Sequence, residues 1–200
     1  MPTHVFRVLP LLVIAFLLPA AASAHTGVGQ TSGFGYGFGH PVSGLDHILA
    51  MVMVGVFAWL LGGRARWLVP ATFVLVMAAG GGLGILGIHV PFVEAGIALS
   101  VIVLGAVVAL GVKAPVAVAM GIVGLFAIFH GYAHGAEMPE NAGGLAYAAG
   151  FMLATALLHA LGIGIGFAIG KVSERYGTYV VRGAGGLATL AGIGILTGAI

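Results

Sequence analysis

The sequence predicts an all-α, polytopic membrane protein: six transmembrane helices after a cleavable signal peptide, with both mature termini in the periplasm. Hydrophobic residues make up 60% of the 200 residues, and the mean hydropathy is +1.18. Only 7 Lys or Arg and 5 Asp or Glu are present. A soluble domain of this length has too little interior to hide so much apolar surface. The chain also contains six separate hydrophobic runs, each about long enough to cross a bilayer.

The N-terminal segment has the pattern of a secretory signal peptide. Arg7 supplies the positive region, "VLPLLVIAFLLPA" is a short apolar core, and "ASA" ends at Ala24 in a typical cleavage pattern. The alternative is an uncleaved first span, but this core is shorter than the roughly 20 residues that a span needs. We therefore expect a signal peptide at 1–24, a Gly-rich periplasmic segment at 25–41 and a six-helix transmembrane domain at 42–200.

The six predicted spans follow one another with short connections. They cover Val42–Leu61, Trp67–Ile88, Glu94–Val112, Pro115–His134, Leu145–Gly170 and Tyr179–Ile200. Glycines spaced by four let helix backbones approach closely, so we interpret such pairs as packing positions. The pairs are Gly80/Gly84, Gly162/Gly166, Gly166/Gly170 and Gly194/Gly198.

The charges of the connecting loops predict the orientation. If the mature N-terminus is outside, the first, third and fifth loops face the cytoplasm. Those loops and their borders hold Arg64, Arg66, Lys113, Lys171, Arg175 and Arg182. The other two loops, "HVPFVE" and "GAEMPENAGG", contain no Lys or Arg, as the positive-inside rule requires.

Composition also limits the chemistry. A formal charge of +2 does not indicate nucleic-acid binding. The chain has no cysteine, which excludes disulfides, thiolate metal sites and thiol catalysis. His, Asp and Glu are then the strong metal donors, and they suit nickel, cobalt or zinc. No Walker motif is present, so direct ATP hydrolysis by this chain is not expected.

The first donor cluster is "HPVSGLDH", from His40 to His47. Pro41 suits the first position of a helix, with His40 near the cap. His40 and His47 are seven residues apart on one face, about 10 Å along an ideal helix axis. They would then bind an ion in succession rather than together. Asp46 and His47 would lie deeper than His40.

The second cluster, "FHGYAHGAE", runs from Phe129 to Glu137. His130, His134 and Glu137 occupy positions i, i+4 and i+7, which form one stripe. Because this helix runs outward, both clusters lie at the periplasmic end. Ionisable groups in a membrane usually mark an ion pathway or a paired interior site. The predicted metal ligands form an outer rung of His40, His134 and Glu137 and an inner rung of Asp46, His47 and His130.

The remaining polar residues receive simpler interpretations. We expect His159 to be an interhelical hydrogen-bond partner. His89 and Glu94 belong to a short outer loop and are interpreted as solvated or accessory, and Glu140 and Glu174 as loop charges. Cleavage after Ala24 would make His25 the first mature residue, where its amine and imidazole could chelate a metal. The sequence leaves that role of His25 open.

Both clusters resemble the motifs of the HupE/UreJ family, whose members are membrane proteins linked to hydrogenase and urease maturation and regarded as nickel permeases. The family pattern H-P-x-x-G-x-D-H is similar to the stretch from His40 to His47. The pattern F-H-G-x-A-H-G-x-E is similar to the stretch from Phe129 to Glu137. The resemblance extends over essentially the whole chain and implies nickel rather than another borderline metal.

The expected function is therefore transport of Ni²⁺ from periplasm to cytoplasm by a multi-pass protein of the bacterial inner membrane. The ion is a substrate, with Co²⁺ and Zn²⁺ as alternatives, and no prosthetic group or enzymatic activity is expected. Membrane lipid is the other expected partner, and the resemblance implies a link to hydrogenase or urease maturation. The alternative is an intramembrane zinc-dependent hydrolase, although no H-E-x-x-H motif is present. Energy coupling and homo-oligomerisation stay open.

Overall fold

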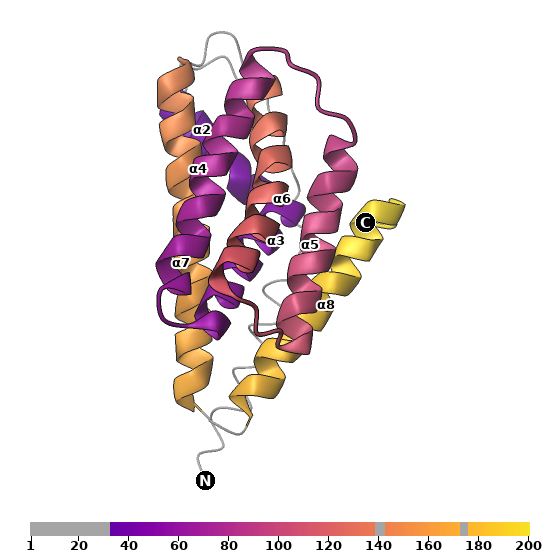
Figure 1. Ribbon diagram of the computed structural model, residues 1–200. Helices are drawn as coiled ribbons and strands as arrows, with labels where there is room; N and C mark the ends of the chain where they lie inside the picture. The colour runs from indigo at the N-terminus through magenta and orange to yellow at the C-terminus, as the bar shows by residue number, and fades with distance from the viewer. Residues whose placement is uncertain (1–32, 139–142, 173–175) are drawn as a thin grey trace. The chain divides into compact units, whose positions relative to one another are not determined.

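The computed structural model describes residues 33–138, 143–172 and 176–200, all of which belong to one unit, residues 31–200. The predicted signal peptide and His25, Glu140, Glu174 and Arg175 lie outside the described residues. The described helices are α2 (Gly33–Ser43), α3 (Leu45–Leu61), α4 (Ala65–Ile85), α5 (Val93–Leu110), α6 (Val116–Ala136), α7 (Gly144–Val172) and α8 (Gly177–Thr197). Figure 1 shows α4, α6 and α7 running lengthwise beside α5 and α8.

The expectation of an all-α membrane domain is confirmed. In the described part of the chain, the five helices α4–α8 are each long and apolar enough to cross a membrane. The pair α2 and α3 would supply a sixth span if it counts as one broken helix. The helix boundaries of α4–α8 follow the predicted spans closely, because long hydrophobic runs identify membrane helices well.

The expectation of a continuous first span is wrong. The chain bends by 83° between α2 and α3. Gly44 at the break has φ −100° and ψ 129°, an extended conformation. Pro41 does not begin the helix but lies inside α2, where it cannot donate to the preceding turn. The hydroxyl of Ser43 donates to the His40 carbonyl at 2.7 Å, which satisfies one acceptor where α2 ends.

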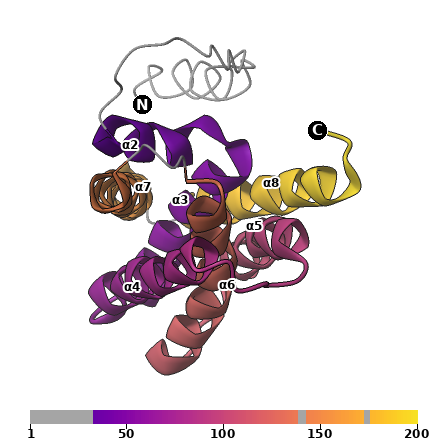
Figure 2. The same ribbon diagram turned by 90° about the horizontal axis from the view of Figure 1, so that it is seen from above.

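Tertiary packing explains why α2 turns aside. Gly37 of α2 lies against the backbone of Tyr147 in α7, and Gly150 of α7 lies against the carbonyl of Phe34. A methyl group at either glycine would overlap with those backbone atoms. In Figure 2, α2 lies beside α7, which is seen end on. The close approach of these two helices therefore fixes α2 away from the axis of α3.

Helix α3 is the centre of the described bundle. It contacts each of the other described helices. Its residues 50–58 are buried without interruption, in agreement with its place among helices on all sides. Asp46 and His47 lie in the first turn of α3, just before this buried stretch, with Asp46 half-buried and His47 9% exposed.

Glycines bring α4 and α6 together. Gly80 and Gly84 of α4 contact the backbone of α6 at Ile128 and Tyr132, as expected for packing positions. Gly131 and Gly135 of α6 contact the backbone of α4 in return. Gly162 likewise contacts the backbone of Val52, whereas Gly166 and Gly170 lie against the side-chain ring of Trp59. The interpretation is wrong for Gly194 and Gly198: Gly194 lies near only Ile200 among the described residues, and Gly198 ends α8 with φ +69°.

Two arginines make contacts between helices: Arg182 of α8 with α5, and Arg66 of α4 with α7. The guanidinium of Arg182 donates to the carbonyls of Ala109 and Leu110, each at 2.8 Å. A positive group at the C-terminal end of a helix also interacts favourably with the helix dipole. The guanidinium of Arg66 lies 4.7 Å from the ring centre of Phe167, a cation–π contact.

Candidate metal site

A pocket of about 210 Å³ opens between α2, α3, α5 and α6. It is lined by His40, Ser43, Gly44, Asp46, His47, Glu94, Ile97, Ala133, His134 and Glu137. Three of these side chains are carboxylic acids, and no described Lys or Arg lines the pocket. A concave site with acidic walls raises the local concentration of cations.

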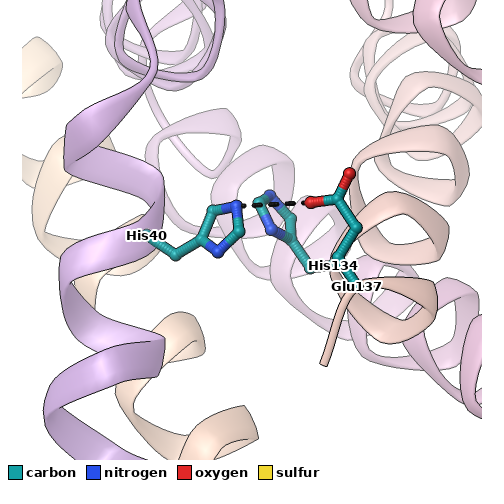
Figure 3. A group of neighbouring side chains, drawn as sticks. All are labelled: His40, His134 and Glu137. Carbon is teal, nitrogen blue, oxygen red and sulfur yellow. Dashed lines mark ion pairs between the residues drawn. The ribbon is translucent and has the colours of Figure 1, made fainter. Parts of the chain in front are cut away.

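His40, His134 and Glu137 form a group with metal-binding geometry. Each offers one ligand atom, and these atoms all lie within 4.8 Å of one another. Nε2 of His40 lies 3.6 Å from Oε2 of Glu137, and Figure 3 shows this contact across the gap between α2 and the end of α6. His40 faces α6 from the last turn of α2, just before the bend at Gly44. His134 is 2% exposed, so the group reaches from solvent into the bundle.

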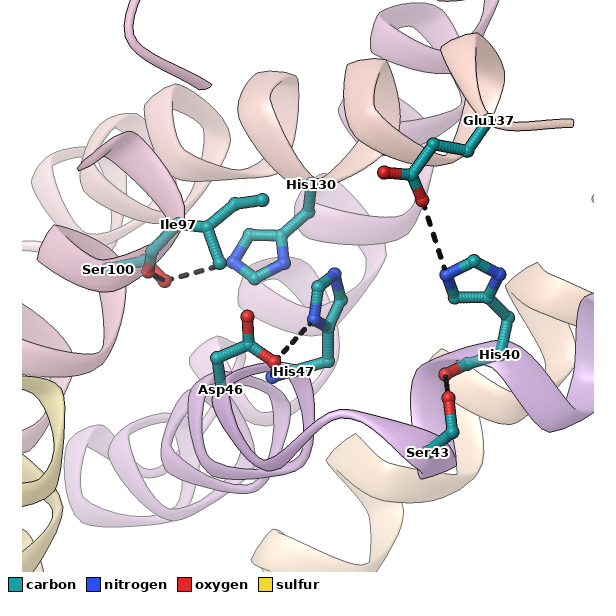
Figure 4. A network of polar contacts seen from close by, with 8 residues as sticks. All are labelled: His40, Ser43, Asp46, His47, Ile97, Ser100, His130 and Glu137. Atoms are coloured by element: carbon teal, nitrogen blue, oxygen red, sulfur yellow. Dashed lines mark hydrogen bonds and ion pairs between the residues drawn. The ribbon is translucent and has the colours of Figure 1, made fainter. Parts of the chain in front are cut away.

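Asp46 holds the neighbouring imidazole of His47 (Figure 4). Oδ1 of Asp46 accepts hydrogen bonds from both the backbone N–H and Nδ1 of His47, each at 2.8 Å. Because a carboxylate can only accept, the proton of the imidazole is on Nδ1. Nε2 then carries the lone pair, and it has no hydrogen-bond partner among the described residues. Asp46 therefore orients His47 so that one nitrogen can bind a cation.

Ser100 of α5 favours the tautomer of His130 that is opposite to that of His47, with the proton on Nε2. The Ser100 hydroxyl donates to the carbonyl of Ile97 at 2.6 Å and lies 2.9 Å from Nε2 of His130. Its only hydrogen is used on Ile97, so Nε2 of His130 must be the donor in the second contact. The lone pair of His130 is then on Nδ1, which has no hydrogen-bond partner in the described residues. Figure 4 shows both contacts.

The imidazole rings form a continuous series from the pocket into the bundle. Ring centres are 4.4 Å apart for His40 and His134, 4.6 Å for His134 and His47, and 4.8 Å for His47 and His130. The first ring is partly exposed and the last is completely buried. The structure brings together all six residues selected from the sequence, but His134 contacts both His40 and His47, so they form one series rather than two separate rungs.

Aromatic residues of α7 contact the outer part of this series of imidazole rings. Tyr147 Oη lies 3.3 Å from Nδ1 of His40, on the side away from Glu137. The ring of Phe151 is 3.9 Å from that of His134 and stacks parallel to Tyr147. These contacts restrict the orientation of His40 and His134 without supplying a charge.

Two site residues were not selected from the sequence. Glu94 is exposed and lines the pocket, in agreement with its interpretation as solvated or accessory; it lies in the first turn of α5, directly after Phe92 turns the chain with φ 59°. His89 is exposed and does not line the pocket. Ser100 gives no signal in the sequence, since a lone serine in a span is common. Glu94 had a signal, because a carboxylate next to a span at the same end as both clusters is a candidate ligand.

The interpretation of His159 as a hydrogen-bond partner is wrong. His159 is 1% exposed, and neither ring nitrogen forms a hydrogen bond with any residue that the structure describes. Its aromatic contact is the ring of Phe73 in α4, 5.1 Å away at nearly a right angle. The physical reason is that α3 and α4 present apolar side chains and glycine backbone to this part of α7.

Comparison with known proteins confirms the family that the two motifs indicate. Residues 12–195 match the family described as HupE / UreJ protein. The chain is 51% identical over 185 residues to Protein HupE of Rhizobium leguminosarum bv. viciae, covering 92% of this chain and 94% of that protein. No solved structure matches the chain. The chain belongs to the HupE/UreJ family of membrane proteins, which is linked to hydrogenase and urease accessory functions and is generally considered to consist of transporters rather than enzymes.

Proposed function

We propose that this protein carries Ni²⁺ from the periplasm into the cytoplasm of a bacterium and so supplies hydrogenase or urease maturation. One observation carries the proposal. The ligand atoms of His40, His134 and Glu137 lie within 4.8 Å of one another in an acid-lined pocket, and further imidazoles continue from it into the bundle. Imidazole nitrogen with carboxylate oxygen suits borderline divalent metals.

The mechanism follows from the change in surroundings along the series of rings. At the pocket, Glu137 and His40 are partly exposed, so an incoming ion can exchange water for these ligands one at a time. His134 then transfers it toward His47, whose Nε2 lone pair is fixed by Asp46. His130, completely buried, presents Nδ1 at the inner end. Asp46, which lines the pocket beside His47, balances part of the ion's charge before the ion reaches His130.

The orientation rests on the charged loops. The pocket and the loop that carries Arg64 and Arg66 are at opposite ends of α3, since Asp46 lies in its first turn and the loop follows Leu61. Basic loops face the cytoplasm in most membrane proteins, so the pocket would face the periplasm. The ion would then enter the pocket from the periplasm.

The test is uptake of radioactive nickel into proteoliposomes that contain the full-length chain, with Co²⁺ and Zn²⁺ as competitors. We expect saturable uptake that depends on the protein and is inhibited most by unlabelled Ni²⁺. Glu137→Gln should raise the nickel concentration for half-maximal uptake, whereas the exposed His89→Ala should not. Uptake no faster than in empty vesicles would exclude the transport function. Metal-dependent cleavage of lipid in the same vesicles would instead favour an intramembrane hydrolase.

A further inference from the structure

His159 has the surroundings of a binding group rather than of a packing residue. It lies near the middle of α7, is 1% exposed, and keeps both ring nitrogens without a hydrogen bond among the described residues. Burying an unpaired polar group costs free energy, and an apolar side chain of similar size would avoid that cost. Buried polar atoms without partners are uncommon, so the position calls for a specific explanation.

His159 continues the series of rings beyond His130. The ring of Phe73 lies 5.6 Å from that of His130 and 5.1 Å from that of His159. Phe73 is therefore a ring neighbour of both imidazoles. The Ser100 contact leaves the lone pair of His130 on Nδ1, which is likewise unpaired among the described residues. Two buried imidazoles with available lone pairs thus share one aromatic neighbour.

The turn next to His159 also carries soft and neutral donors. Thr155 lies four residues before His159 in α7, and Met77 lies four residues after Phe73 in α4. The hydroxyl of Thr155 contacts the sulfur of Met77 at 3.7 Å, so these two turns face each other. Both residues are buried. The donors around this position are therefore the imidazole of His159, the thioether of Met77 and the hydroxyl of Thr155, and the contacts named here include no carboxylate.

We propose that His159 forms an inner binding station for the transported divalent cation, which the ion reaches from Nδ1 of His130 beside their shared neighbour Phe73. This inference rests on the proposed transport function and extends the pathway from the pocket to the middle of the membrane. The outer pocket contains carboxylates, whereas the inner station offers neutral donors. A neutral station binds a divalent cation less tightly, and conduction requires sites from which the ion can leave.

The first test uses the absence of cysteine from this sequence. His159→Cys would place one thiol at the proposed station of the full-length protein in detergent. Addition of Co²⁺ or Ni²⁺ should then produce a thiolate-to-metal charge-transfer band. Leu158→Cys is the matched control, because it is the adjacent buried residue of α7 but points about 100° away around the helix. A monodisperse, helical His159→Cys protein without the band would overturn the proposal.

The second test is transport by His159→Leu, with Leu158→Ala as its control. We expect nickel uptake per inserted molecule to fall at least about tenfold for His159→Leu, with equilibrium nickel binding at the pocket changed less than about twofold. Normal uptake by His159→Leu would overturn the station while leaving the transport function intact. If the unaltered protein moved no nickel, transport itself would fail, and the charge-transfer band would still report whether a cation reaches position 159.

Discussion

At the scale of single residues, the site depends on neighbours that decide which nitrogen of each imidazole is free. Asp46 leaves Nε2 of His47 available, and Ser100 leaves Nδ1 of His130 available. The two rings are 4.8 Å apart between centres. Such outer partners typically change metal affinity or activity about 10- to 100-fold when they are removed.

Asp46→Asn should reduce nickel uptake per inserted molecule by about tenfold or more. The amide has almost the same size, but it lacks the charge and can turn its NH₂ group toward Nδ1 of His47. That rotation would stabilise the wrong tautomer. The measurement is uptake normalised to inserted protein, with thermal stability in detergent as the check on folding. Near-normal uptake would show that the carboxylate is not part of the pathway.

Ser100→Ala should lower nickel affinity about tenfold, because Nε2 of His130 loses its acceptor and the ring can change tautomer or rotate. Thr72→Val is a suitable control, since the Thr72 hydroxyl donates within its own helix to the Leu68 carbonyl. Nickel binding by isothermal titration checks both variants. Equal affinities for the two would mean that Ser100 does not position His130.

At the scale of helices, the break between α2 and α3 creates the pocket. Because of the break, His40 lines the pocket from α2, while Asp46 and His47 line it from α3. Gly44 permits the break and also leaves room for two site residues. A Cβ atom at this position would lie 2.6 Å from Oδ1 of Asp46 and 3.2 Å from Nδ1 of His47.

Gly44→Ala should therefore displace the Asp46 carboxylate from His47 and weaken nickel uptake, while the helices keep their places. The backbone itself is not the obstacle, since φ −100° and ψ 129° are accessible to alanine. Gly39→Ala, in α2, is the matched control because nothing lies within 4 Å of its added methyl group. Loss of uptake in both variants alike would point to α2 as a whole and not to this contact.

Gly131→Ala addresses the packing of α4 against α6. The added methyl would overlap with the carbonyl oxygen of Met77, so the helices must separate. We expect a lower midpoint of thermal unfolding together with reduced nickel binding, because His130 and His134 move with α6. Gly121→Ala, on the same helix with open space around it, should change neither quantity. A stable Gly131→Ala protein would contradict this packing.

At the scale of the whole molecule, hydropathy is sufficient to predict the five spans α4–α8, and helix direction is sufficient to bring the two donor clusters to one end. The bend at Gly44 could not be predicted, because it depends on Gly37 and Gly150 meeting backbone atoms far away in the sequence. The place of Glu94 depends on the turn at Phe92, which hydropathy does not describe. That His159 has no hydrogen-bond partner among the described residues could not be predicted either, because this depends on which apolar faces surround α7.

The shortness of α3 has an electrical consequence. Its 17 residues rise about 25 Å, less than the hydrocarbon thickness of about 30 Å. With α2 turned aside, a water-filled pocket would have the same electrical potential as the outer solution, even below the membrane surface. The membrane voltage would then drop across the part of the protein between the pocket and the cytoplasm. Moving a charge through that voltage is worth about 2.3 kcal/mol per elementary charge per 100 mV, and about twice that for a divalent ion.

Nickel influx should therefore accelerate when an inside-negative potassium diffusion potential is imposed on proteoliposomes. The nickel concentration for half-maximal influx should hardly change, because binding in the pocket occurs before the ion enters the field, whereas the maximal rate should rise. Vesicles with equal potassium on both sides provide the reference at zero voltage. A half-maximal concentration that shifts strongly with voltage would place the first binding step inside the field.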